Sequence, residues 1–396
     1  MTLKKISGWL HLWLGLIAGL IVMIIALTGA IYTFQPELTK ATQPYLSVKA
    51  ENRPFLPASA FKAIAEKQLP GKKPIRIMLR GKDESVNVMF FERKKNPYYY
   101  NVYMNPYSGK ALVVKDMYKD FFYVTLLGHL YLWLPQPIGH VVNIYGTLTF
   151  LVIIISGIVL WWPRNKARRK TSFKVKWDAS PKRLNYDLHN VLGFYASWII
   201  LFAVLTGLVW GFEWAAKAEY SLLSGGKSKP VLPKIKVVPV DQPVKDPLDK
   251  ITAIVQARNP NAKRVMLMLP ATDSAAVGVR IYNDEQLNYT TDLAYFNPYT
   301  LEEIKVPHWG KYSEATIADK AVRMNYDIHV GAIAGWPGRI LMFFAALITA
   351  SLPVTGFYIW WGKKKKDKKK GKDTPKKAGT VRATLSYAAS KEVSQT

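Results

Sequence analysis

The sequence predicts an α-helical membrane protein in which four transmembrane helices form two tandem repeats, and each repeat carries a polar α+β domain. Three observations predict this fold class. The apolar residues gather in four long runs, a histidine–glycine pattern recurs between the two halves, and the strongest basic clusters lie beside the same ends of the runs.

The apolar runs are predicted to be spanning helices. They lie at 6–34, 141–162, 192–212 and 340–361, and each is near the roughly 20 residues needed to cross a hydrocarbon layer. The first run is too long for the core of a signal peptide and has no small-residue cleavage site after it. We therefore expect it to remain as a helix.

Basic residues beside the runs predict the orientation. Lys4 and Lys5, the segment 164–183 and the lysine block 363–370 flank the same ends, and such clusters mark the cytoplasmic side. Both termini are thus expected to be cytoplasmic, and the polar stretches 35–120 and 215–323 to be periplasmic. The predicted location is the bacterial inner membrane, with several membrane passes.

The net charge of +28 is explained by lipid headgroups and insertion topology, so no nucleic acid partner is expected. The lipid bilayer is the expected partner of these basic segments. The stretch 72–95 in the first external domain is also basic. It is either an anion-attracting surface or an ordinary solvated face.

An internal repeat organises the chain. Placing residues 5–15 beside 183–193 aligns His11 with His189, and Gly15 with Gly193, without a gap. Downstream, Leu-Thr-Gly recurs in both halves, and the second and fourth helices both end in Gly-x-x-x-Trp-Trp. Because each half crosses the membrane twice, the halves are expected to be related by an axis along the membrane normal.

Each external stretch contains a helical segment, alternating strands and an Asn-Pro-Tyr turn. The predicted boundaries are spanning helix 1 at 1–35, external domain 1 at 36–122, an external helix with spanning helix 2 at 123–162, a basic cytoplasmic loop at 163–185, spanning helix 3 at 186–214, external domain 2 at 215–323, an external helix with spanning helix 4 at 324–362, and a disordered cytoplasmic tail at 363–396.

Histidines are the candidate cofactor ligands. The chain has no cysteine, which excludes disulfides, cysteine-ligated iron–sulfur clusters and c-type haem attachment. His11 and His189 lie at equal depth on the cytoplasmic side, as axial ligands of one haem b would. Gly15, one helical turn from His11, would leave room for a flat macrocycle. The alternative is that Gly15 and Gly19 form a close-packing surface and His11 only touches headgroups.

A second haem is predicted on the external side. The repeat aligns His129 with His329, and it aligns His140 with Arg339 after a one-residue gap. His140 could replace His129 as a ligand or hydrogen-bond a propionate, while Arg339 suits a propionate or a lipid phosphate. His308 is interpreted as an ordinary surface histidine.

These motifs resemble the PepSY-associated transmembrane helix family, often described as iron-regulated membrane proteins. The resemblance rests on the His11-to-Gly15 opening, Leu127-Gly-His129 with Pro137-Ile-Gly139, Leu188-His189 with Gly193, Ile328-His329 with Gly331, and the Gly-x-x-x-Trp-Trp endings. It covers nearly the whole chain except the tail. It implies an inner-membrane protein with two periplasmic PepSY-type modules and, as in characterised relatives, a dihaem ferric-siderophore reductase.

The predicted function is haem-dependent electron transfer across the membrane, reducing a ferric siderophore or other ferric chelate for iron uptake. No nucleotide or flavin motif is present, so the electrons must come from a cytoplasmic or membrane-pool donor. The rival hypothesis is a non-redox binding module, in which the helices only anchor PepSY-type domains that hold a periplasmic peptide or protein.

Overall fold

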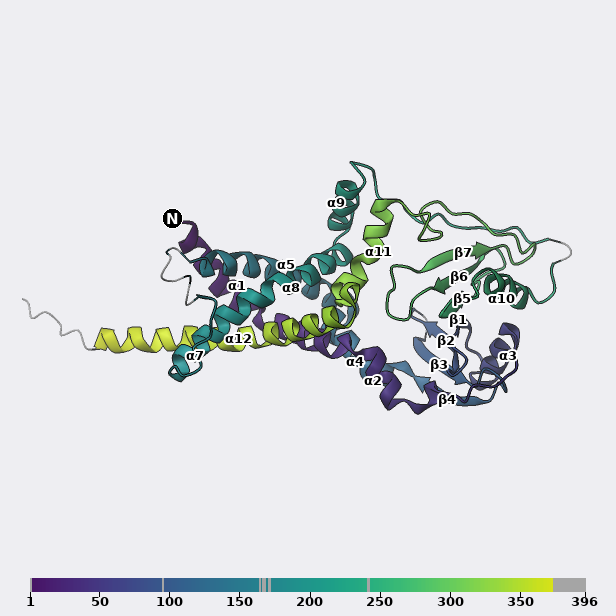
Figure 1. Ribbon diagram of the computed structural model, residues 1–396, viewed down its shortest axis with the longest axis horizontal. Coiled ribbons are helices and arrows are strands. Elements are labelled where there is room, and N and C mark those ends of the chain that lie inside the picture. Colours follow the sequence, from purple (N-terminus) through teal and green to yellow (C-terminus); the bar gives the residue numbers. More distant parts are fainter. Residues whose placement is uncertain are drawn as a thin grey trace, which may run out of the picture.

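Four long apolar helices form one end of the computed structural model, which describes residues 2–372 apart from 95, 164, 166–168, 170, 171, 241 and 242. Their bounds as candidate membrane spans are Leu3–Thr33, Gln136–Trp161, Pro181–Gly211 and Ala332–Lys364. These agree with the predicted runs, so the prediction of a multi-pass membrane protein is confirmed. Figure 1 shows the N-terminus at one end of the bundle, here called the termini side, and a β-sheet beyond the other, the sheet side.

Close crossings hold the bundle together. Helix α1 (Leu3–Thr33) packs against α5 (Gln136–Trp161) and α12 (Gly335–Lys372), and α8 (Gly193–Gly211) packs against the same two helices. A Cβ at Gly19 would lie 3.1 Å from Pro353 Cβ, and one at Gly146 would lie 2.7 Å from Ile21 Cγ2. Glycine at these crossings lets the backbones approach, which is how helices associate where water provides no driving force.

Two segments either differ from the predicted boundaries or lie largely outside the described residues. Helix α12 continues to Lys372, past the predicted end at 362, because lysine is a good helix former. The rest of the predicted disordered tail, 373–396, lies outside the described residues, as does most of 164–171 in the basic loop.

Short helices link the bundle to the sheet. Helices α2 (Gln35–Thr42) and α9 (Glu213–Leu223) follow α1 and α8. Helix α4 (Phe121–Tyr131) leads into α5 and packs on α1, whereas α11 (Ile317–His329) precedes α12 and packs on α8. The remaining short elements are α7 (Pro181–Asp187), the π turn η3 (Leu188–Leu192), and the 3-10 turns η1 (Pro44–Leu46), η2 (Met117–Lys119) and η4 (Ala332–Ala334).

Both polar stretches contribute strands to one seven-stranded antiparallel sheet of order β4-β3-β2-β1-β5-β6-β7. The halves join where β1 and β5 pair, with Ile77 opposite Leu267. The sequence predicted an α+β unit in each stretch but not this junction. The strands are β1 (Pro74–Leu79), β2 (Val86–Glu92), β3 (Tyr98–Met104), β4 (Ala111–Asp116), β5 (Arg264–Met268), β6 (Val277–Tyr282) and β7 (Asp292–Phe296).

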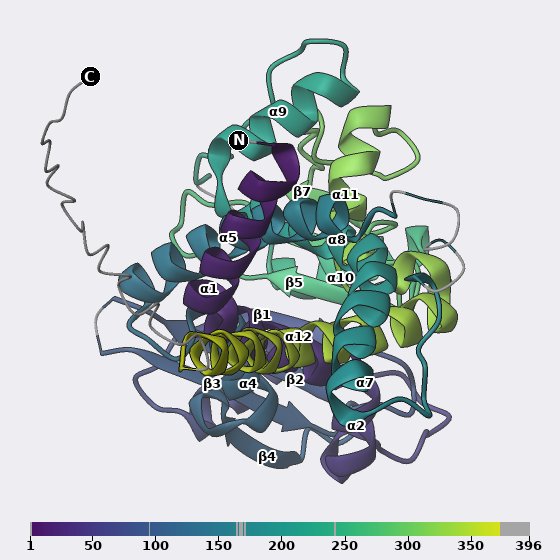
Figure 2. The same cartoon turned by 90° about the vertical axis from the view of Figure 1, so that its left-hand side faces the viewer.

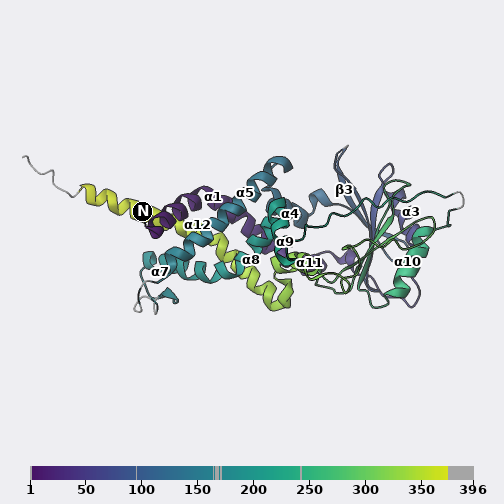
Figure 3. The same ribbon diagram turned by 90° about the horizontal axis from the view of Figure 1, so that it is seen from above.

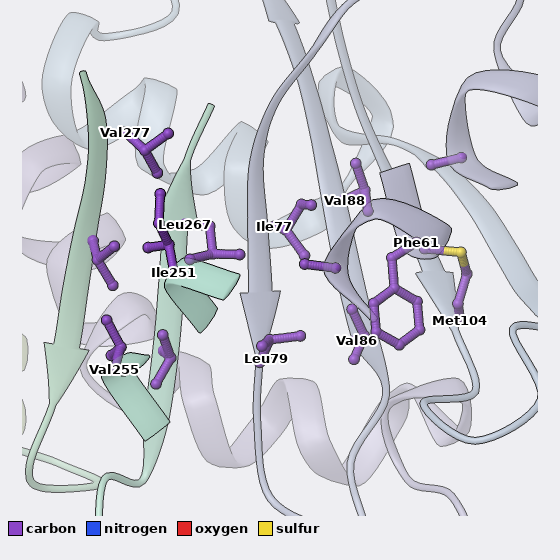
Figure 4. Packing of buried hydrophobic residues seen from close by; sticks show 14 of the residues in the cluster. Phe61, Ile77, Leu79, Val86, Val88, Met104, Ile251, Val255, Leu267 and Val277 are labelled. Atoms are coloured by element: carbon purple, nitrogen blue, oxygen red, sulfur yellow. The ribbon is translucent and has the colours of Figure 1, made fainter. Parts of the chain in front are cut away.

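One face of the sheet forms the apolar core. Helices α3 (Ala58–Gln68) and α10 (Pro247–Arg258) cover it, and Phe61 and Ile251 are fully buried there. Figure 4 shows these side chains packed over alternate strand residues such as Val88 and Leu267. The period-two alternation of the strands puts the apolar set on this side.

The opposite face of the sheet is directed toward the membrane bundle. Figures 1 and 3 place the sheet between the helices α3 and α10 and the bundle. In Figure 2, seen from the termini side, the bundle lies in front of the sheet. On this face the register sets Met78 opposite Met266, and Met266 opposite Arg280. Two exposed arginines on this face, Arg76 and Arg280, are therefore held above the sheet side of the bundle.

Candidate functional site

Four histidines form two pairs at opposite ends of the bundle. On the termini side His11 of α1 and His189 of η3 have ring centroids 6.3 Å apart. On the sheet side His129 of α4 and His329 of α11 have ring centroids 6.0 Å apart. The structure thus brings together the two repeat-related pairs that the sequence singled out.

The Nδ1 atoms of the termini-side pair are both occupied. His11 donates its Nδ1–H to the Ile153 carbonyl at 3.0 Å and lies 3.2 Å from Ser156 Oγ. His189 Nδ1 lies 2.9 Å from Thr355 Oγ1. The Thr355 hydroxyl donates to carbonyls of its own helix, so it accepts from His189. Both rings are therefore assigned the tautomer with a free Nε2 lone pair.

The sheet-side pair repeats the arrangement. His129 donates to the Ile25 carbonyl at 2.9 Å, with Thr28 Oγ1 at 3.4 Å. His329 Nδ1 lies 2.9 Å from Thr206 Oγ1, whose hydroxyl donates to the Phe202 carbonyl. Ligand histidines commonly carry such an oxygen partner on the second ring nitrogen, because it fixes the tautomer and the ring orientation.

A hydroxyl residue followed by glycine faces each histidine. We call these the hydroxyl–glycine steps. At three of them a Cβ on the glycine would lie 3.0–3.1 Å from a ring carbon of the histidine, and at the fourth, Gly207, it would lie 3.8 Å away. The hydroxyl orients the ring and the glycine leaves room for it. The steps are Ser156-Gly157 at His11, Thr355-Gly356 at His189, Thr28-Gly29 at His129 and Thr206-Gly207 at His329.

Sequence reasoning missed these steps. It gave Gly15 and Gly193 another role, to leave room for a flat macrocycle; both line a cavity together with His11 and His189, and that role stays a prediction. The repeat did align Leu-Thr-Gly at 27–29 with 205–207. That alignment was the available signal, although the histidine served by each step lies on a different helix.

His189 also occupies an unusual backbone. Residues Leu188–Leu192 form a π turn between α7 and α8. Single π turns inside α-helices are rare and are found frequently at functional sites. The wider turn changes the direction in which His189 projects relative to a regular helix.

A mainly apolar cavity of about 440 Å³ adjoins the termini-side pair. Its lining includes both histidines, and also Trp161 Nε1 and Thr349 Oγ1, two buried polar atoms with no hydrogen-bond partner among the described residues. Lys363, a cation that sequence reasoning did not consider as a site residue, also lines it. The cavity thus offers apolar walls, two imidazoles and polar groups that a bound molecule could satisfy.

The pairs suit a metal inside a macrocycle better than a bare ion. With metal–nitrogen bonds of about 2 Å and a ring centroid about 1 Å beyond its nitrogen, imidazoles on opposite faces of one metal have centroids about 6 Å apart. Both pairs match that spacing. Within the described part of the chain no three histidine or acidic residues gather at one metal-sized site. Two axial ligands without others are what a haem, which brings four ring nitrogens, requires.

The other predicted residues lie apart from the pairs. His140 is exposed near the start of α5. Arg339 is 4% exposed and donates to both carboxylate oxygens of Glu37 and to the Thr33 carbonyl. Its predicted role toward a propionate stays a prediction, with Glu37 as its partner in the structure. Trp210, which was not predicted, lies 5.0 Å from His329 between ring centroids.

Comparison with known proteins agrees with the resemblance noted in the sequence. A family model described as the PepSY-associated TM region matches residues 8–363. Among curated proteins no match was found. The matched region includes the sheet, both histidine pairs and all but the outermost residues of the four spanning helices, so this chain belongs to the PepSY-associated transmembrane family.

Proposed function

We propose that the protein carries electrons across the membrane with two haem b groups and reduces a ferric chelate on the sheet side. One observation carries the proposal. Two histidine pairs at opposite ends of one bundle have the centroid separation of axial ligands, and all four Nδ1 atoms are already engaged by oxygen.

His11 and His189 would hold one haem, and His129 and His329 the other. When bound, haem supplies one-electron chemistry through its iron. The residues of the chain supply ligation and orientation: the hydroxyl–glycine steps fix each imidazole, and apolar helix walls exclude water. Axial ligand identity and the hydrogen bonds behind it are the means by which a protein tunes the potential.

Two sites at different depths suit transfer across a bilayer. Along α1, His11 is 14 residues before Ile25, whose carbonyl accepts from His129. At a rise of 1.5 Å per residue the pairs are separated by roughly 21 Å, a large part of the ~30 Å hydrocarbon layer. A single site would leave most of that thickness uncrossed.

The direction follows from the predicted topology. If the termini side is cytoplasmic, a cytoplasmic or membrane-pool donor would deliver electrons at His11 and His189. The sheet side would then face the periplasm of a bacterial inner membrane, where a chelate too polar for the bilayer can approach. Reducing Fe(III) to Fe(II) loosens hard oxygen ligands, which would release iron for uptake.

The test is an absorption spectrum of protein purified after haem-replete expression. We expect a Soret band and two haems per chain. His11→Ala and His329→Ala should each lose a different haem, while His140→Ala, a matched histidine outside both pairs, should keep both. Protein without a Soret band, or one haem lost in both ligand variants, would reject the two-site proposal.

A further inference from the structure

A second cavity lies on the sheet side, away from both histidine pairs. Its volume is about 460 Å³, within the usual range for small-molecule sites. Residues of α9, the segment 229–230, β6, the segment 288–309 and α11 line it. Those that carry the argument are Lys229, Arg280, Thr291, Trp309, Arg323 and Tyr326.

The lining is strongly cationic. Lys229 and Arg280 are exposed and make no ion pair with any residue that the structure describes. Arg323 donates to the carbonyls of Thr291, His308 and Gly310 rather than to a carboxylate. Asp319, which lines the cavity, and Asp292 interact electrostatically with Arg323. Three positive side chains against one carboxylate in the lining still favour an anion.

The acid in the cavity lining is already engaged. Asp319 accepts hydrogen bonds from His308 at 2.8 Å, Thr316 at 2.6 Å and Tyr220 at 3.2 Å. Burial raises the pKa of Asp319, but these hydrogen bonds outweigh it and the net pKa is lowered. His308, interpreted from sequence as a surface residue, instead ties its loop to α11. The carboxylate offsets part of the charge of Arg323, but three cations against one acid leave the cavity lining net positive.

Two buried donors in the lining have no partner. Thr291 is 8% exposed, and its Oγ1, like Trp309 Nε1, makes no hydrogen bond to any described residue. Both can donate to an oxygen. Buried polar groups are seldom left unpaired, so these two lining residues have donors to offer to an acceptor oxygen.

The cavity is close to the sheet-side histidines. Tyr326 lines it, and His329 follows three residues later on α11. Residues three apart lie on the same face of a helix. A ligand in the cavity would therefore lie about one helical turn from His329.

We propose that this cavity binds a compact anionic ferric chelate with carboxylate-type oxygen donors. The assignment of iron rests on the proposed function, whereas the anionic oxygen chemistry rests on the cavity itself. It places the substrate against the second polar stretch, between the sheet and α11, and not on the basic stretch 72–95.

Binding can be measured without electron transfer by using gallium(III) citrate, which is not reduced. Calorimetry on the full-length protein in nanodiscs of zwitterionic lipid should show binding. Arg280→Ala should weaken it by about tenfold or more, since it removes a charge-assisted hydrogen bond. Arg76→Ala is the matched control, because Arg76 is an exposed arginine on the same sheet face outside the cavity.

Each outcome decides between the claims. No binding to the wild type, or equal loss in Arg280→Ala and Arg76→Ala, would overturn the assignment. If anionic phospholipid in the nanodisc abolished binding, the cavity would be a lipid-headgroup site and the assignment would also fall. If gallium citrate bound as expected but dithionite-reduced protein failed to pass electrons to ferric citrate, the cavity assignment would stand and the proposed function would fail.

Discussion

At the scale of single residues, the candidate site depends on small groups placed behind the four paired histidines. Each histidine has one nitrogen engaged by an oxygen and one ring edge against glycine. The serine or threonine hydroxyl orients the ring. Glycine, which carries a hydrogen atom where alanine would carry a methyl group, leaves room for it. These contacts are between different helices, so they form only when the bundle is assembled.

Thr355→Val tests the hydroxyl. It keeps the shape of the side chain but removes the acceptor of His189 Nδ1–H, and loss of such a partner costs about 10–100-fold in metal affinity. We expect haem at the termini side to transfer to apomyoglobin correspondingly faster and its midpoint potential to change. Ser351→Ala, one turn earlier on α12, is the control. Identical rates of haem transfer from the two variants would contradict the role of the Thr355 hydroxyl.

Gly157→Ala tests the glycine. The added Cβ would lie 3.0 Å from His11 Cε1, tighter than ordinary contact, so the ring must shift. We expect termini-side haem to be reduced or lost while the sheet-side haem remains, measured by haem content and spectrum. Gly8→Ala is the matched control, because its added Cβ would lie 3.7 Å from Leu160 Cδ2, an ordinary contact distance. Full haem loading in Gly157→Ala would argue that the clearance is not needed.

At the scale of elements, the sequence predicted what local patterns encode. The four helices and the pairing of His11 with His189 followed from apolar length and from repeat register, both of which lie within short segments. The π turn at Leu188–Leu192 could not be predicted because it depends on how α8 packs. The β1–β5 junction could not be predicted either, because almost half of the chain separates its two strands and each has a common apolar alternation.

The link between α2 and α12 is a further element-scale feature that sequence reasoning missed. Hydrogen bonds from Arg339 lower the pKa of Glu37 below its usual value of 4.5. A lowered folded-state pKa means that the stabilisation is fully present above pH 4.5 and is lost as pH falls through the folded value. The guanidinium also lies over Phe34 and Trp336, so α12 is held to the start of α2.

Glu37→Gln should therefore lower the thermal midpoint at pH 7 and make it less dependent on pH between 5 and 3. The measurement is thermal unfolding in detergent across that range. Glu66→Gln is the control, because Glu66 is in an exposed pair with Lys62 on α3, where ion pairs contribute little. If both substitutions lowered the thermal midpoint at pH 7 equally, the Arg339–Glu37 pair would contribute no more stability than an exposed ion pair.

At the scale of the whole molecule, two histidine sites lie in one bundle and the sheet covers only one of its ends. For the proposed electron transfer, that asymmetry would set a direction. An electron entering at the termini side would leave beneath the cationic face of the sheet. The direction is useful only if the termini side is the cytoplasmic one, as the basic clusters predict.

Cysteine labelling would determine that orientation, and the cysteine-free chain makes single substitutions clean. Ser108, exposed in the turn before β4, and Ser180, exposed before α7, report the two ends of the bundle. Because basic segments resist translocation, we expect Ser108→Cys to react with an impermeant maleimide in intact spheroplasts, and Ser180→Cys to react only after permeabilisation. The reverse pattern would put the sheet in the cytoplasm, and the protein would then have to deliver electrons inward, with no route to an external chelate.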